Sequence, residues 1–63
     1  MYNLSWEEAQ KAMSEGDKVK HRHFCCDEWF QMINGVIYCE GEYNMSRWYK
    51  GDEWQKTGWT IVH

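Results

Sequence analysis

The sequence predicts an α+β fold, in which one N-terminal helix packs on a small antiparallel β-sheet within a single domain spanning residues 1–63. Two observations predict this class. Apolar residues near the N-terminus recur at helical spacing. The rest of the chain alternates with a period of two and carries an Asn-Gly pair between two β-rich runs. A length of 63 residues leaves room for one domain only.

The helix is expected over residues 5–15. Ser5 and Glu8 form the Ser-x-x-Glu pattern of a capping box at its start. Gly16 follows the last periodic residue and supplies the usual stop of a helix. The apolar stripe that would face the sheet consists of Leu4, Ala9, Ala12 and Met13.

Three stretches after the helix are expected to form the sheet. The clearest is a hairpin over residues 28–40, because Asn34-Gly35 is the favoured pair for a type I′ turn. Residues 41–51 carry a weaker pattern, which leaves a loop, a short strand and a helical turn open. The other two expected strands are residues 17–24 and 58–63.

The composition excludes several classes of protein. Five Trp, four Tyr and two Phe, with no proline, argue against a disordered chain. A formal net charge of −3 argues against a binder of nucleic-acid polymers. No apolar run approaches the roughly 20 residues that span a bilayer, and the acidic N-terminus lacks the apolar core of a secretory signal. We therefore expect a cytoplasmic protein without a membrane partner.

The small size and the many rings together predict self-association. A fold of this length has little interior volume for eleven aromatic side chains, so some should lie at an interface or a ligand pocket. The three cysteines include the adjacent pair Cys25 and Cys26, which favours free thiols over disulfides. A homo-oligomer, either a dimer or a tetramer, is the expected way of stabilising such a small core.

No catalytic motif is present, and we do not expect an enzyme, although Cys25 or Cys26 with a nearby histidine could in principle form a nucleophile pair. On an extended strand His21, His23 and Cys25 would share a face, and Cys39 could complete a tetrahedral zinc site. The spacing is not a standard zinc signature. Ordinary residues of a half-exposed strand are the favoured interpretation, and no cofactor is expected.

A basic stretch offers a different chemistry. Lys18, Lys20 and Arg22 beside Phe24 could bind a phosphate and stack a base. The alternative is a solvated charged strand with a core phenylalanine, which is the commoner case. Because the whole chain is acidic, any anionic ligand should be small and locally bound. The candidate ligand-binding residues are Lys20, Arg22, Phe24, Trp29, Trp48 and Trp54.

The helix itself is acidic, which suggests another kind of surface. Glu7, Glu8 and Glu15 are followed by Asp17. Such a row could bind a protein or mimic DNA, but a solubilising helix face is the more common interpretation.

The order of these signals resembles a family of very small phage proteins, the Thoeris anti-defence sponges of the second type and phage proteins sharing their fold. The scaffold matches are the pairs Glu8-Ala9 and Ala12-Met13, and the closing run Trp59-Thr60-Ile61-Val62. Further matches fall on Gly16, Val19 and Gly35. At the two basic positions of the family this chain has Lys20 and His21. Phe24 occupies the position of the base-stacking Trp that ends the basic strand in the family. Gly58 occupies the position of an acidic residue.

The resemblance implies a homo-oligomeric α+β protein that binds a nucleotide immune signal between subunits and sequesters it without cleavage. The signal would be a cyclic ADP-ribose-like molecule or a cyclic oligonucleotide, and the site of action would be the cytoplasm of the infected bacterial host. The alternative is a phage inhibitor that binds a host defence protein or complex, in the manner of an anti-CRISPR protein.

Overall fold

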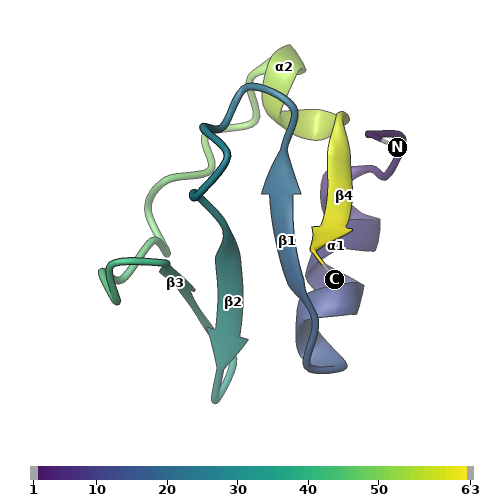
Figure 1. Cartoon of the computed structure of the whole chain (residues 1–63). Helices are drawn as coiled ribbons and strands as arrows, with labels where there is room; N and C mark the ends of the chain where they lie inside the picture. Colours follow the sequence, from purple (N-terminus) through teal and green to yellow (C-terminus); the bar gives the residue numbers. More distant parts are fainter. Residues whose placement is uncertain (1, 63) are drawn as a thin grey trace.

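The computed structural model describes residues 2–62. These residues form a four-stranded antiparallel sheet with a helix packed on one face (Figure 1). The strand order is β3-β2-β1-β4. This arrangement confirms the predicted α+β class with an N-terminal helix. The elements in chain order are α1 (Trp6–Ser14), β1 (Lys18–His21), β2 (Phe30–Ile33), β3 (Val36–Cys39), α2 (Glu53–Lys56) and β4 (Trp59–Val62).

Both ends of α1 are built as the sequence predicts. The Glu8 amide donates to the Ser5 hydroxyl at 3.0 Å, and the Ser5 amide donates to the Glu8 carboxylate at 2.9 Å. At the other end Gly16 has a φ of +99°, and its amide donates to the Met13 carbonyl. The Asp17 amide reaches back to the Ala12 carbonyl, which completes a Schellman motif. The capping box and the glycine stop therefore fix the helix bounds locally.

The strands pair in a simple antiparallel order. In the β2–β3 ladder Ile33 lies opposite Val36, and the two residues between them, Asn34 and Gly35, both have positive φ angles of 52° and 80°. The closing strand β4 lies beside β1, with Trp59 opposite His21. On its other edge Trp59 exchanges two backbone hydrogen bonds with Leu4, which ties the start of the chain to the sheet.

The basic strand is shorter than predicted. It ends at His21, and the Phe24 amide donates to the His21 carbonyl at 3.0 Å, so the chain turns at residues 22–24 instead of continuing. The expected alternation over residues 17–24 is therefore wrong beyond His21. His23 is exposed and does not share the buried environment of His21.

The hydrophobic core lies between α1 and the sheet. Trp6, Phe30 and Trp59 are buried there. Ala9, Ala12 and Met13 of α1 also bury against the sheet, because they recur on one face of the helix.

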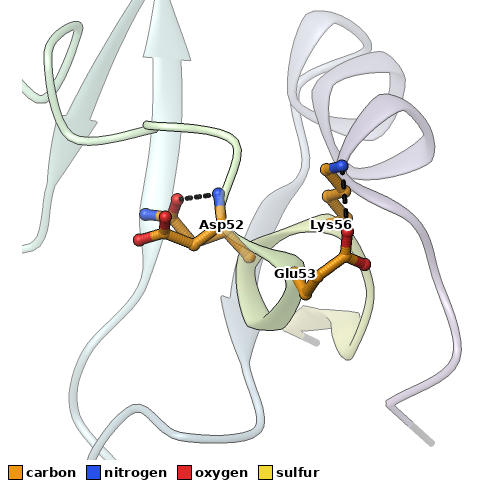
Figure 2. Close-up of polar contacts among 4 residues, drawn as sticks. Asp52, Glu53 and Lys56 are labelled. Atoms are coloured by element: carbon orange, nitrogen blue, oxygen red, sulfur yellow. Dashed lines mark hydrogen bonds and ion pairs between the residues drawn. The ribbon is translucent and has the colours of Figure 1, made fainter.

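A second, one-turn helix lies between residues 52 and 57, where the sequence pattern did not predict one. The side chain of Gln55 is buried, and its oxygen accepts hydrogen bonds from the amides of Lys50 and Asp52 while its nitrogen donates to the Trp48 carbonyl. Figure 2 shows Asp52 at the start of α2 and the exposed ion pair between Glu53 and Lys56, at 3.3 Å. Gln55 thus holds the loop before α2 against the core.

Candidate functional site

The sheet face opposite α1 is uncovered, and we call it the outer face. Val19 and Phe30 are buried on the α1 side and lie opposite each other in β1 and β2. Because successive strand residues point to opposite faces, their neighbours project to the outer face. The residues placed there are Lys18, Lys20, Trp29, Gln31, Ile33 and Tyr38.

A groove of about 410 Å³ crosses this surface, and we call it the outer-face groove. Gln31 and Tyr38 lie directly opposite each other in the β2–β3 ladder and form its floor. Its volume lies within the range of small-molecule sites, about 300–1,000 Å³. The groove is lined by Trp29, Gln31, Ile33, Tyr38, Glu40 and Glu42.

Trp29 carries the clearest recognition feature of the groove. The Lys18 ammonium lies 4.4 Å from the centroid of the indole ring, which is a cation–π contact. The ring is half-buried, so part of it remains open to a ligand. A cation over a half-buried indole ring is an arrangement that suits an anionic group attached to a planar ring.

Charge is divided across β2. Lys18 and Lys20 belong to β1, on one side of β2, whereas Glu40 and Glu42 follow β3, on the other side. The groove lining itself includes two carboxylates and no lysine or arginine. A ligand in the groove would therefore meet carboxylates at the β3 end, and positive charge lies outside the lining, where Lys18 contacts Trp29.

The predicted ligand-binding residues do not form a single site. Lys20 and Trp29 lie on the outer face, as described above. Phe24 and Trp48 are half-buried and pack against the buried core, away from the outer-face groove. They join an aromatic core whose members are Trp6, Phe24, Phe30, Trp48 and Trp59.

The aromatic core is held by ring contacts at close range. The centroids of Phe24 and Phe30 are 5.1 Å apart, and those of Phe30 and Trp48 are 5.0 Å apart in an edge-to-face arrangement. Trp59 lies 5.6 Å from Phe24 and 5.7 Å from Trp48. Such pairs stabilise by about 0.5–1.5 kcal/mol each beyond their burial. These rings therefore contact one another first of all, although Phe24 and Trp48 remain half-buried.

The last two candidates, Trp54 and Arg22, lie near α2. Trp54 remains 45% exposed, with its ring edge against Trp48 and His21. Arg22 is exposed, and its amide donates to the Gly58 carbonyl at 2.9 Å. Neither residue lines the outer-face groove.

His21 is a structural residue. Its Nε2–H donates to the carbonyls of Trp54 and Thr57, at 2.6 and 2.7 Å, while Nδ1 accepts the His23 amide at 3.1 Å. This network assigns the neutral tautomer with the proton on Nε2. Both ring nitrogens are thus occupied, and His21 fastens β1 to the end of α2.

The candidate zinc ligands are not gathered into a site. Among residues 2–62 no group of three or more His, Cys, Asp or Glu side chains could hold a metal ion, so His21, His23, Cys25 and Cys39 do not form the tetrahedral set considered above. The physical reason is the early end of β1, which turns His23 and Cys25 into an exposed loop while His21 stays buried.

Two exposed thiols are held in their neutral form by acidic neighbours. A hydrogen bond to Glu28 and its negative charge raise the pKa of Cys25. The Cys26 thiol donates to the Asp27 carboxylate at 3.0 Å, and this contact with the charge of Asp27 raises the pKa of Cys26. Since the thiolate is the nucleophile, neither cysteine is activated.

A second hollow of about 360 Å³ lies where α1 meets the loop before α2. Within it the rings of Trp6 and Tyr49 stack with centroids 4.6 Å apart. The two aromatic surfaces are used against each other, so this hollow offers less for a ligand than the outer-face groove.

Sequence reasoning missed Gln31, Tyr38, Glu40 and Glu42 as site residues. The register of the paired strands was the signal that could have found them. With Ile33 opposite Val36, alternation brings Gln31 and Tyr38 to the same face as Trp29.

None of the helices within residues 2–62 is long and apolar enough to cross a membrane. Comparison with known proteins finds no match for the chain among protein-family models, curated proteins or solved structures.

Proposed function

We propose that this protein binds a small nucleotide in the outer-face groove and sequesters it without cleaving it. In this proposal the chain is a phage-encoded anti-defence protein that acts in the cytoplasm of the infected bacterium. The ligand is a cyclic ADP-ribose-like molecule or a cyclic oligonucleotide. The observation that carries the proposal is the Lys18–Trp29 contact at 4.4 Å beside a groove of about 410 Å³.

The base of a nucleotide matches the aromatic ring of this site, and its phosphate matches the neighbouring lysines. A base stacked on an aromatic side chain gains about 1–3 kcal/mol. The ammonium groups of Lys18 and Lys20 come from the neighbouring strand and provide point charges for phosphate. Because the formal net charge is −3, this local pair of cations favours a small anion over a long phosphate backbone.

Sequestration rather than cleavage is favoured by the state of the nucleophile candidates. The pKa values of the Cys25 and Cys26 thiols are raised by neighbouring carboxylates, so thiolate is disfavoured. Both nitrogens of His21 are engaged by backbone groups, so this imidazole is not free to act as a base. We therefore assign the protein a binding role and no catalytic step.

A homo-oligomer, either a dimer or a tetramer, belongs to the same proposal. The groove is open to solvent, and Ile33 at its edge is 50% exposed, so an apolar side chain is left there for a second copy to cover. A second copy placed over the outer face would cover Ile33 and enclose the ligand between subunits.

The alternative function, inhibition of a host defence protein by direct binding, is favoured by a different observation. Tyr43 is 73% exposed and lies in the loop that also carries the groove carboxylates Glu40 and Glu42. An exposed ring beside two carboxylates would suit a basic segment of a partner protein. This candidate predicts binding of a protein and no nucleotide affinity.

Titration with nucleotides, followed by tryptophan fluorescence and by melting temperature, tests the proposal. We expect a panel of cyclic ADP-ribose isomers and cyclic dinucleotides to include a ligand that raises the melting temperature by mass action. The substitution Trp29→Ala should abolish that shift, whereas Trp54→Ala, which removes an exposed tryptophan outside the groove, should preserve it.

Two results would reject the proposal. One is the absence of a shift with every member of the panel. The other is an equal loss of binding in both tryptophan variants when circular dichroism shows that both are folded. Light scattering with and without the ligand tests the oligomer, and a monomer under both conditions would contradict a site between subunits.

A further inference from the structure

We infer that the outer-face groove selects a base with the donor edge of guanine, in which a ring N–H and an exocyclic amine lie side by side. This inference rests on the proposed function and narrows its ligand: a cyclic oligonucleotide that contains guanine fits the groove, whereas a cyclic ADP-ribose-like molecule carries adenine. Its basis is the chemistry of the groove walls and the direction in which charge changes across β2.

The walls at the β3 end of the groove accept hydrogen bonds. Glu40 and Glu42 contribute carboxylates, and an ionised carboxylate is an acceptor only. Within residues 2–62 neither of them forms a salt bridge, since the ion pair found there joins Glu53 and Lys56. Their oxygens therefore remain available to a ligand that brings its own donors.

The aromatic residues of the groove fix the orientation of a planar ligand. Trp29 and Tyr38 both line the groove, and Tyr38 lies opposite Gln31 in the β2–β3 ladder. With Lys18 over Trp29, the phosphate of a bound nucleotide is drawn toward β1. The base edge then points away from the lysines and toward the carboxylates that follow β3.

The common bases differ in the hydrogen-bond donors and acceptors that would face these carboxylates. Guanine presents two parallel donors that match the two oxygens of one carboxylate. Uracil presents one ring donor between two carbonyl acceptors, which would lie against the carboxylates and be repelled. Adenine presents an amine next to an acceptor nitrogen and makes one hydrogen bond at most with the same oxygens.

The test compares GMP with IMP, because these nucleotides differ only in the exocyclic amine at C2. AMP and UMP complete the series. We expect GMP to quench tryptophan fluorescence at about five- to tenfold lower concentration than IMP, which is at the low end of what a bidentate base contact provides because these carboxylates are exposed. AMP and UMP should bind more weakly than GMP.

Variants of the carboxylates locate the source of the preference. Glu40→Gln or Glu42→Gln keeps the shape of the side chain but removes the charge, so at least one of them should bring GMP and IMP to equal affinity. Glu15→Gln changes the net charge equally at the end of α1, away from the groove, and should leave the preference intact. A preference that survives in both groove variants overturns the inference.

The outcomes separate this inference from the proposed function. If no nucleotide binds, and the cyclic panel also fails, the proposed function itself is rejected. If nucleotides bind through Trp29 but IMP, AMP or UMP equals or exceeds GMP, only the guanine-type preference is rejected. Preference for GMP that is lost in a groove variant and kept in Glu15→Gln supports both.

Discussion

The outer-face groove and the aromatic core are both built from aromatic residues, yet the sheet assigns them opposite roles. In the core, Trp59 is fully buried and Trp48 lies within 5.0 Å of Phe30 by ring centroids. On the outer face Trp29 meets a lysine instead of another ring. Because Trp29 and Phe30 are adjacent, alternation places one ring on the outer face and the other in the core.

The largest expected effect comes from removing a core ring. Trp59 is fully buried, and its indole N–H donates to the Gln55 carbonyl at 2.8 Å. Trp59→Ala should cost about 3–5 kcal/mol, which equals the whole stability of roughly 3–5 kcal/mol expected for one small core. We therefore expect an unfolded chain by circular dichroism.

The matched change on the outer face should leave the fold intact. Trp29→Ala removes a half-buried ring and one cation–π contact, for which about 0.5–1 kcal/mol is expected at an exposed site. A loss of folding in Trp29→Ala as large as in Trp59→Ala, measured by urea denaturation, would remove the distinction between the two regions.

The next effect concerns Gly58, which is buried between the core and His21. Its φ is +89°, and an added Cβ would lie 3.0 Å from Nε2 of His21 and 2.6 Å from Nε of Arg22. Arg22 is exposed and can move, but Nε2 is held by two carbonyls. Gly58→Ala should therefore destabilise by about 2–4 kcal/mol, from backbone strain and overpacking together.

Gly16 provides the control for the contribution of strain. Its φ of +99° is similar, but an added Cβ would meet nothing within 4 Å. Gly16→Ala should cost about 1–2 kcal/mol from the left-handed backbone alone. Equal losses for the two alanine variants in thermal denaturation would show that contact with His21 contributes nothing.

A smaller effect is expected from Gln55, whose side chain satisfies three backbone groups beside the aromatic core. Gln55→Met keeps the length but leaves the amides of Lys50 and Asp52 and the Trp48 carbonyl without this partner. A loss of about 2 kcal/mol is expected, as for buried groups that lose their hydrogen bonds. Gln10→Met, on the half-buried face of α1, should change stability by less than about 0.5 kcal/mol. The comparison fails if both variants unfold at the same urea concentration.

The smallest effect is chemical and leaves stability unchanged. The pKa of Cys25 is raised mainly by Glu28, so at pH 8 less of this thiol is ionised than in a free cysteine. Glu28→Gln should lower that pKa and speed the alkylation of Cys25 by iodoacetamide, measured by mass spectrometry of the peptide. Because Cys39 is half-buried against the core, it should react more slowly than Cys25 in both proteins. An unchanged rate at Cys25 would contradict the role assigned to Glu28.

Local chemistry made part of the fold predictable. The Ser5–Glu8 capping box and the Gly16 stop act within a few residues, so the bounds of α1 followed from the sequence within one residue. The closing strand was predictable for a similar reason, since Trp59 and Ile61 alternate with Thr60 and Val62. Of the predicted ligand-binding residues, Trp29 and Lys20 lie on the outer face, and their role there stays a prediction.

The remainder depended on contacts between distant parts of the chain. The end of β1 at His21 is set by hydrogen bonds to Trp54 and Thr57, more than 30 residues away in the sequence. The one-turn α2 is too short for a periodic pattern and is held by Gln55. The turn after His21 and the loop before α2 place Phe24 and Trp48 against the core, although their sequence neighbours suggested a ligand pocket.

The sequence by itself determined the α+β class, the capped helix, and a number of aromatic residues larger than the expected capacity of a small interior. Only the tertiary structure decided which rings fill that interior, because this depends on strand register and on where β1 turns. Five rings fit into the aromatic core by meeting edge to face or at tilted angles, so the interior holds more of them than length alone suggested. Trp29 precedes Phe30 by one residue and therefore lies on the opposite face of the sheet, where it lines the outer-face groove.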